Sequence, residues 1–214
     1  MTKPLIAIMG RSGQGKSTSI RNLDPKKTLV LITENKPLPF RNSKIFKPVY
    51  VTEPMQLFAY LEAVNAREAY EAVVVDSFTG WSEQLAVRAY SEYKNFDIQN
   101  FYNENVAKLF KILKSMNKYT FLTCHDDQID TVGGGKVVSG RVKFKANNGI
   151  IEESATVMAY CKTVDDPKGG TKHVFDFKSN PYNPSKAPMD LLKAEITPND
   201  MRIILDSLKE FYAE

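Results

Sequence analysis

The chain has 214 residues, of which 43% are hydrophobic and 25% are charged. This composition is typical of a globular protein with one large or two small domains, and it excludes disordered and fibrous classes. The apolar runs, such as Leu5–Met9 and Ala72–Val75, are far shorter than the roughly 20 residues of a membrane-spanning helix. The two cysteines, Cys124 and Cys161, are too far apart to form a metal-binding or redox motif. We therefore expect a cytoplasmic protein that does not interact with a membrane.

The net charge of +4 is concentrated in one segment. Thr131–Gly149 contains no acidic residue and four cations, which are Lys136, Arg141, Lys143 and Lys145. Without these four, 25 of the 29 basic residues remain and equal the 25 acidic residues in number. A local excess of positive charge in a flexible segment indicates an anionic partner such as a nucleic acid.

Short apolar runs alternate with helical patterns as far as Cys124. Such runs are typical of strands that are buried on both faces of a parallel sheet. The predicted strands are Lys3–Met9, Thr28–Thr33, Val49–Val51, Glu71–Asp76 and Tyr119–Cys124. The predicted helices are Lys16–Leu23, Pro54–Tyr70 and Thr79–Met116, the last interrupted near Lys94–Asn100.

The rest of the chain departs from this alternation. Asp126–Gly149 contains five glycines and is predicted to be a loop or a flexible hairpin. Ser154–Val164 and Lys172–Lys178 are predicted to be strands joined by a turn. The final helix is expected to have Thr197 as its N-cap and Pro198 in its first position. We therefore expect one α/β domain that spans all 214 residues, with a mainly parallel central sheet, flanking helices and an antiparallel extension.

A complete G-x-x-x-x-G-K-[ST] phosphate loop lies between the first predicted strand and the first predicted helix. Its glycines allow backbone N–H groups to face phosphate oxygens, and the following helix is expected to direct its positive end at the same anion. Lys16 is expected to bind the β- and γ-phosphates of ATP and to act in catalysis, while the Ser17 hydroxyl is expected to ligate Mg²⁺. The residues expected to bind the nucleotide are Gly10, Arg11, Ser12, Gly13, Gln14, Gly15, Lys16, Ser17 and Thr18.

Three further polar residues stand at the ends of predicted strands. Asp76 ends an apolar strand, where an acid near a phosphate loop commonly helps to hold Mg²⁺. Glu34 follows Thr28–Thr33 and is a candidate for polarising the water that attacks the nucleotide. His125 follows another strand and is a candidate for a hydrogen bond to the γ-phosphate. Each residue also fits a purely structural interpretation, as a turn acid, a solvated carboxylate or a buried histidine.

The segments GRSGQGKST, LITE, VVVDS and TCH occur in the order of the RecA-like ATPases. The chain most resembles the small phage-encoded RecA-like proteins that act with single-strand annealing in recombination, and the resemblance covers roughly residues 3–178. It implies a RecA-like P-loop NTPase fold in which Glu34 is catalytic, Asp76 is the acidic strand end and His125 is the sensor. It further implies Mg²⁺-dependent ATP hydrolysis and binding of single-stranded DNA. The implied partners are a phage annealing or single-strand-binding protein and further copies of the chain, in the cytoplasm of a bacterial host.

The resemblance also implies two regions that face DNA. In this family the loops after the Asp76 strand and the His125 strand have that role, so the four cations within Asp126–Gly149 are the expected DNA-binding residues. The region after Asp76 contains aromatic side chains that suit base stacking but equally suit a helix core. These aromatic residues are Tyr90, Tyr93, Phe96, Phe101 and Tyr102.

Two other functions fit a phosphate loop in a chain of this size. A small-molecule or nucleotide kinase would have an arginine-rich lid, whereas Gly133–Lys145 contains a single arginine. Such a kinase is expected to place the Asp76 strand directly beside the phosphate-loop strand, while the RecA-like plan inserts the His125 strand between them. The second alternative is a non-catalytic, nucleotide-gated binding module, and Glu34 argues against it.

Overall fold

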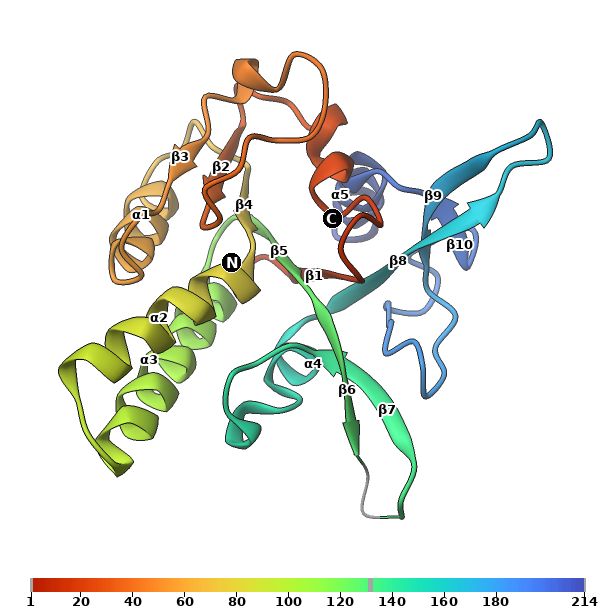
Figure 1. Cartoon of the computed structure of the whole chain (residues 1–214). Coiled ribbons are helices and arrows are strands. Elements are labelled where there is room, and N and C mark those ends of the chain that lie inside the picture. The colour runs from red at the N-terminus through yellow and green to blue at the C-terminus, as the bar shows by residue number, and fades with distance from the viewer. Residues whose placement is uncertain (1, 131–132, 214) are drawn as a thin grey trace.

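The computed structural model of the protein describes residues 2–130 and 133–213. An eight-stranded sheet runs through the middle of the molecule (Figure 1). Its strands, in spatial order, are β10 (Ile196–Pro198), β9 (Thr171–Asp176), β8 (Val157–Asp165), β1 (Leu5–Met9), β5 (Tyr119–Cys124), β4 (Ala72–Asp76), β2 (Thr28–Ile32) and β3 (Val49–Tyr50). The strands from β8 to β3 are parallel, whereas β9 and β10 join by antiparallel pairing. The predicted mainly parallel sheet with an antiparallel extension is confirmed.

The position of β5 distinguishes the two strand orders that were expected. β5 pairs with β1 through Phe121 and Ile6 and with β4 through Phe121 and Val74. It therefore lies between the phosphate-loop strand and the Asp76 strand, which is the RecA-like order and not that of a kinase. Because β1, β5, β4 and β2 all run in the same direction, the residues that follow them gather at one edge of the sheet.

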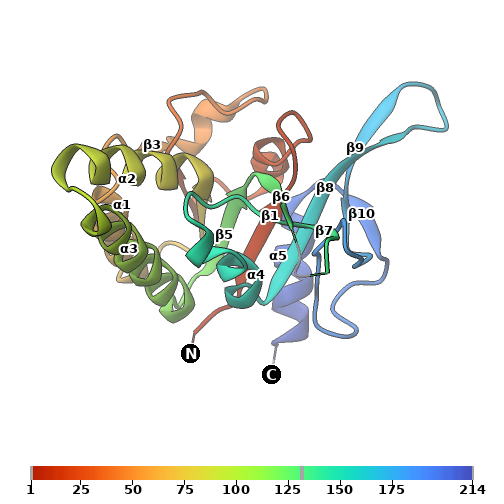
Figure 2. The ribbon, with the colours of Figure 1, turned by 60° about the horizontal axis from the view of Figure 1, so that its bottom comes forward.

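Helices cover both faces of the sheet (Figure 2). One face packs against α1 (Gln56–Asn65), α2 (Phe78–Glu92), α3 (Phe96–Ser115) and α4 (Ile150–Ser154), and the other against the 3₁₀ helix η1 (Ser17–Asn22) and α5 (Met201–Phe211). Alternate side chains of β1 enter the two cores, Ala7 the first and Ile8 the second. This burial on both faces explains why the strand is wholly apolar. None of the helices in the described ranges combines the length and the apolar character needed to cross a bilayer.

Several elements differ from their predictions. The helix after the phosphate loop is a six-residue 3₁₀ helix and not an α-helix over Lys16–Leu23. The break in the long helical region is confined to residues 93–95, where Asn95 adopts a positive φ of 52°. The short helix α4 was not predicted, and it shifts the start of the following strand from Ser154 to Val157.

The segment Asp126–Gly149, predicted to be a loop or a flexible hairpin, is built around a hairpin. It contains β6 (Asp126–Asp130), β7 (Lys136–Gly140) and the 3₁₀ helix η3 (Lys145–Asn147). β6 and β7 form a separate antiparallel ribbon that projects away from the main sheet (Figure 1). Thr131 and Val132, which belong to the predicted basic segment, lie outside the described residues. The hairpin alternative of the prediction is therefore confirmed.

The start of α5 also corrects the sequence prediction. Its N-cap is Asp200 and not Thr197, because Ile196–Pro198 pairs with β9 and keeps Thr197 in extended backbone. The Asp200 side chain accepts a hydrogen bond of 2.9 Å from the Arg202 N–H group. It also accepts one of 2.6 Å from Asn22 Nδ2, so the same carboxylate joins α5 to η1.

We expect Asp200→Ala to lower the free energy of unfolding by about 1 kcal/mol, because the N-cap acceptor is lost. Asp200→Asn is the matched control, since asparagine caps helices about as well as aspartate and should cost much less. Urea denaturation followed by circular dichroism measures both variants. Equal losses for the two would assign the effect to charge and contradict the capping role.

Candidate nucleotide-binding site

The phosphate loop connects β1 to η1 at the carboxyl edge of the sheet. Gly10 and Gly15 have φ values of 153° and 91°, a region that favours glycine. A Cβ atom at Gly10 would lie 2.8 Å from the Cys161 carbonyl oxygen, and one at Gly15 would lie 3.1 Å from His173 Cγ. Glycine therefore lets the loop pass close to β8 and β9. Because η1 is shorter than predicted, the loop N–H groups and Lys16 are the main groups available to bind an anion.

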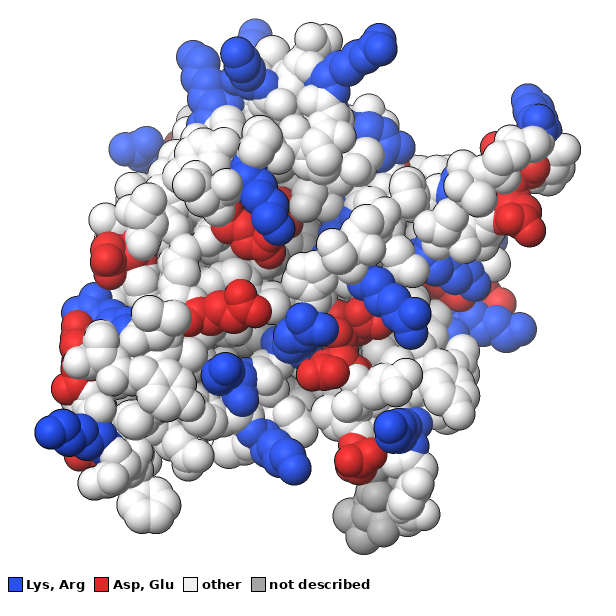
Figure 3. Space-filling view, in the orientation of Figure 1, with Lys and Arg blue, Asp and Glu red and all other residues white. Residues whose placement is uncertain are grey.

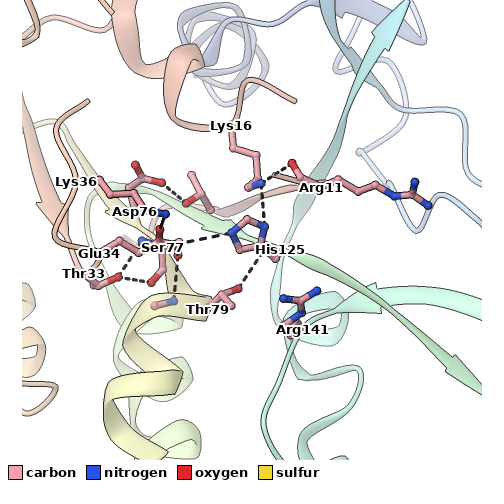
Figure 4. Close-up of polar contacts among 12 residues, drawn as sticks. Arg11, Lys16, Thr33, Glu34, Lys36, Asp76, Ser77, Thr79, His125 and Arg141 are labelled. Carbon is pink, nitrogen blue, oxygen red and sulfur yellow. Dashed lines mark hydrogen bonds and ion pairs between the residues drawn. The ribbon is translucent and has the colours of Figure 1, made fainter. Parts of the chain in front are cut away.

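Lys16 turns its ammonium group back over the loop (Figure 4). Its Nζ donates to the carbonyl oxygens of Gly10 at 2.7 Å and Arg11 at 2.9 Å, and it lies 3.3 Å from His125 Nδ1. Burial lowers the pKa of Lys16 below its ordinary value, and nearby groups that include Asp76 oppose this only in part. A buried ammonium group attracts phosphate more strongly than one in water, because the surroundings screen its charge less.

Asp76 ends β4 beside the loop and accepts a hydrogen bond from Thr123 Oγ1. Burial raises the pKa of Asp76, while hydrogen bonds from the hydroxyls of Thr123 and Ser17 act in the opposite direction. Ser17 and Asp76 thus present a hydroxyl and a carboxylate oxygen together, a donor set that fits Mg²⁺. Among the described residues, no group of three or more His, Cys, Asp or Glu could hold a metal. A Mg²⁺ ion at this pair would therefore complete its shell with phosphate oxygens and water.

Both carboxylate oxygens of Glu34 are engaged. Oε1 accepts a hydrogen bond of 2.7 Å from Ser77 Oγ, and Oε2 accepts one of 2.6 Å from Lys36 Nζ. Burial alone would raise the pKa of Glu34, but the hydrogen bonds from Lys36 and Ser77 bring it below its ordinary value. Glu34 is therefore ionised at neutral pH, and it lines the same cavity as Lys16 and Asp76.

The residues that position Glu34 were missed by the sequence analysis. Thr33 Oγ1 donates to the Ser77 carbonyl at 2.6 Å and accepts from the Ser77 N–H group at 2.9 Å, which ties the end of β2 to the start of α2. Ser77 Oγ is also the N-cap of α2 and accepts from the Gly80 N–H group. A Cβ atom at Gly80 would lie 2.6 Å from Glu34 Cγ, so glycine makes room for the carboxylate. The available signal was the serine directly after VVVD, a residue type that prefers the N-cap.

His125 points into the cavity between Lys16 and Glu34 (Figure 4). Its backbone N–H group donates to Thr79 Oγ1 at 2.9 Å, and its Nε2 lies 3.9 Å from Glu34 Oε1. Burial and the charge of Lys16 lower the pKa of His125, despite the opposing effect of Glu34. The ring is therefore neutral at neutral pH. If Nδ1 accepts from Lys16, Nε2 bears the proton and is the donor that faces Glu34.

A cavity of about 300 Å³ brings most of the predicted site residues together. The predicted residues that line it are Ser12, Gly13, Gly15, Lys16, Ser17, Thr18, Glu34, Asp76 and His125. The predicted residues Arg11 and Gln14 do not line this cavity. The Arg11 side chain extends toward Asp126, with 4.0 Å between Nε and Oδ2. Gln14 Oε1 accepts a hydrogen bond from the Arg11 N–H group. Lys36 and Pro39 line the cavity from the loop after β2, and neither was predicted.

The four predicted DNA-binding cations are exposed, but the fold separates them. They are Lys136, Arg141, Lys143 and Lys145. Arg141 lies beside the cavity. Its backbone N–H group donates to the His125 carbonyl oxygen at 2.8 Å, and its guanidinium Nη2 donates to the Asp126 carbonyl oxygen at 3.4 Å. Lys136 lies on the ribbon directly opposite Asp130. The ribbon is therefore of mixed charge, and the basic excess is concentrated in the segment after it.

The sequence profile of the family described as AAA domain matches residues 2–189. The chain belongs to this AAA domain family. Similar solved structures include the flagellar accessory protein FlaH from Methanocaldococcus jannaschii, with 18% sequence identity and a TM-score of 0.43 over 90% of this chain and 83% of that chain. A KaiC-like protein from Pyrococcus horikoshii OT3 has 15% identity and a TM-score of 0.48 over 91% of this chain and 88% of its own. No curated protein sequence matches the chain.

Family membership, the phosphate loop and the strand order agree on one fold. This AAA domain has the fold of a RecA-like P-loop NTPase, and its phosphate loop lies at the carboxyl edge of the sheet.

We expect Lys16→Ala to weaken ATP binding about a hundredfold or more, because the backbone N–H groups alone cannot neutralise the β- and γ-phosphates. Isothermal titration calorimetry in the presence of Mg²⁺ measures the affinity. Lys26→Ala is the control, since Lys26 is exposed and lies outside the cavity. Unchanged ATP affinity in the Lys16 variant would contradict the assignment of the phosphate loop.

Proposed function

We propose that this AAA domain is a Mg²⁺-dependent ATPase that binds single-stranded DNA and acts in phage recombination or replication. The ATPase part rests on one observation, the convergence on one cavity of Lys16 from the loop after β1, Asp76 from the end of β4 and Glu34 from the turn after β2. These residues supply a cation for the phosphates, an oxygen ligand for Mg²⁺ and a carboxylate for the attacking water.

The groups of the chain account for each part of the conversion of ATP and water to ADP and inorganic phosphate. Lys16 and the loop N–H groups bind the phosphates, while Ser17 and Asp76 hold Mg²⁺ in place. When bound, Mg²⁺ neutralises the charge that develops on the phosphate oxygens. Glu34 accepts the proton of the attacking water. Neutral His125 donates from Nε2 to the terminal phosphate, so that it loses this hydrogen bond when the phosphate leaves.

Specific observations weigh against the two alternative functions. The insertion of β5 between β1 and β4 disagrees with the strand order expected of a kinase. Glu34, ionised and held at the cavity by Ser77, disagrees with a module that only binds nucleotide. ATP turnover with and without DNA distinguishes the ATPase from such a module.

The DNA-binding part rests on a surface where basic and aromatic side chains meet. Phe144 lies between Lys143 and Lys145 in the chain, and its ring packs edge-on against Tyr102 with 4.9 Å between centroids. Its centroid is 6.5 Å from that of Tyr90 on α2. The basic segment after the ribbon is therefore attached to the α2–α3 pair. We name the surface formed by Lys143, Phe144, Lys145 and Tyr90 the basic–aromatic surface.

Two of the predicted stacking residues, Tyr90 and Phe96, are exposed, which favours a role outside the core. Tyr90 is 56% exposed, and Phe96 at the start of α3 is 83% exposed, whereas Tyr102 is fully buried. Figure 3 shows Lys and Arg side chains on the face between the α2–α3 pair and the β6–β7 ribbon. Exposed rings stack on bases while lysines neutralise phosphates, which is the usual combination for single strands.

The biological setting is proposed from the resemblance of the sequence motifs alone. It comprises a phage annealing or single-strand-binding protein as partner and assembly with further copies of the chain. The single domain over residues 1–214 is proposed instead from the alternation of strands and helices along the sequence.

We expect Glu34→Gln to lower ATP turnover by about 10²–10⁴-fold, because the amide keeps the shape of the carboxylate but cannot accept the proton of water. ATP affinity should stay near that of the wild type. Phosphate release measures turnover, and calorimetry measures binding. Glu62→Gln is the control, since Glu62 is an exposed acid of α1 outside the cavity and should retain full turnover. Near-normal turnover in the Glu34 variant would place the base elsewhere.

We expect replacement of Lys136, Lys143 and Lys145 by Gln to weaken binding to every single-stranded sequence alike, because contacts to phosphates do not depend on the base. Each lost phosphate contact flattens the slope of log K against log salt by about 0.7, so the slope should fall by about 2. Fluorescence anisotropy over a salt series measures it. Arg141 is left intact because it contacts His125.

The matched control replaces three exposed lysines elsewhere, Lys26, Lys27 and Lys44, and removes the same charge. An equal change in both triple variants would indicate a general charge effect and contradict a DNA site on this segment.

A further inference from the structure

Lys36 turns back over the carboxylate of Glu34. Its N–H group donates to the Glu34 carbonyl at 2.7 Å, which closes a tight turn. Pro37 restricts the backbone of Lys36, and buried Leu38 anchors the loop. The Lys36 side chain is nevertheless 73% exposed. Its backbone is therefore held in place while its ammonium group is free to change partners.

Two cations, Lys16 and Lys36, are found among the described residues that line the cavity. An ammonium group has three donors, and those of Lys16 face two loop carbonyl oxygens and His125 Nδ1. Arg11 extends toward Asp126 instead. Lys16, assigned above to the β- and γ-phosphates, would exchange these contacts to bind them, so Lys36 is the exposed cavity cation best placed to respond to a further negative charge.

The contact between Lys36 and Glu34 is suited to exchange. Exposed ion pairs contribute little, because water screens them and long side chains lose freedom in forming them. A terminal phosphate bears more negative charge than a carboxylate and attracts an ammonium group more strongly at the same distance. Glu34 would stay in place after losing Lys36, because Ser77 Oγ holds its other oxygen at 2.7 Å.

We infer that Lys36 exchanges Glu34 for the terminal phosphate of a bound nucleoside triphosphate and so releases the base only when that phosphate is present. The inference deepens the proposed ATPase function and rests on it. While Lys36 contacts Glu34 Oε2, its positive charge and hydrogen bond make the carboxylate a weaker acceptor for a proton from water. Binding of Lys36 to the terminal phosphate frees Oε2 next to the group that water attacks. A diphosphate lacks that group and leaves the pair intact.

The test compares the affinities of Lys36→Gln for ADP and for a non-hydrolysable ATP analogue, measured by calorimetry with Mg²⁺. The triphosphate should bind about tenfold more weakly than to the wild type, because one charge-assisted hydrogen bond is lost. ADP should bind within about twofold of the wild type, since Lys36 does not reach the β-phosphate in this scheme. Lys36→Arg keeps the charge and should restore most of the preference for triphosphate. Lys44→Gln, an exposed lysine of the same loop outside the cavity, is the control.

The outcomes separate this inference from the function on which it rests. A wild-type protein that binds neither nucleotide would overturn the ATPase proposal and the inference together. Normal wild-type binding with an unchanged ratio of triphosphate to diphosphate affinity in Lys36→Gln would overturn the Lys36 inference alone. An equal loss for both nucleotides would also overturn it, because Lys36 would then act on the whole loop.

Discussion

Parallel hydrogen bonding among β1, β5, β4 and β2 is the interaction on which the site depends. The register places Met9 beside Cys124, Ile32 beside Asp76 and Val75 beside Leu122, so the four strands end within about one residue of the same level. The phosphate loop, His125 and the Glu34 turn leave the sheet at that level. Two apolar cores pack against the strands from opposite faces of the sheet. Close packing of this kind keeps the ends of the strands in fixed relative positions.

Burial and hydrogen bonding give the neighbouring side chains of the cavity different protonation states. Burial lowers the pKa of Lys16 and His125 and raises that of Asp76, whereas hydrogen bonds outweigh burial and lower the pKa of Glu34. At neutral pH a neutral imidazole therefore lies between a cation and an ionised carboxylate. Perturbed groups of this kind are concentrated at functional sites, because chemistry on phosphates needs donors, acceptors and cations within one small volume.

The nucleotide cavity and the basic–aromatic surface are linked by a short stretch of chain. The His125 ring faces Lys16, while its carbonyl accepts from the N–H group of Arg141, which directly follows β7 at the base of the β6–β7 ribbon. Three residues after Arg141, Phe144 packs on Tyr102 of α3. The segment that begins at His125 and includes Phe144 thus contacts both Lys16 and α3, and its strands β6 and β7 pair with each other through backbone hydrogen bonds.

The amino-acid sequence by itself determined the parts of this protein that depend on a few neighbouring residues. The glycine spacing of the phosphate loop, the apolar strands and the polar residues that end them were all predictable, because backbone freedom and burial leave short-range patterns. Tertiary structure decided the rest. Thr197 does not cap a helix because its backbone pairs with β9. The two candidate DNA regions lie on one surface because Phe144 packs on Tyr102 of α3. The partners of Glu34 at Ser77 and the position of β5 between β1 and β4 depend on contacts between segments far apart in the chain, and no local pattern encodes which distant partner a strand or a charge will meet.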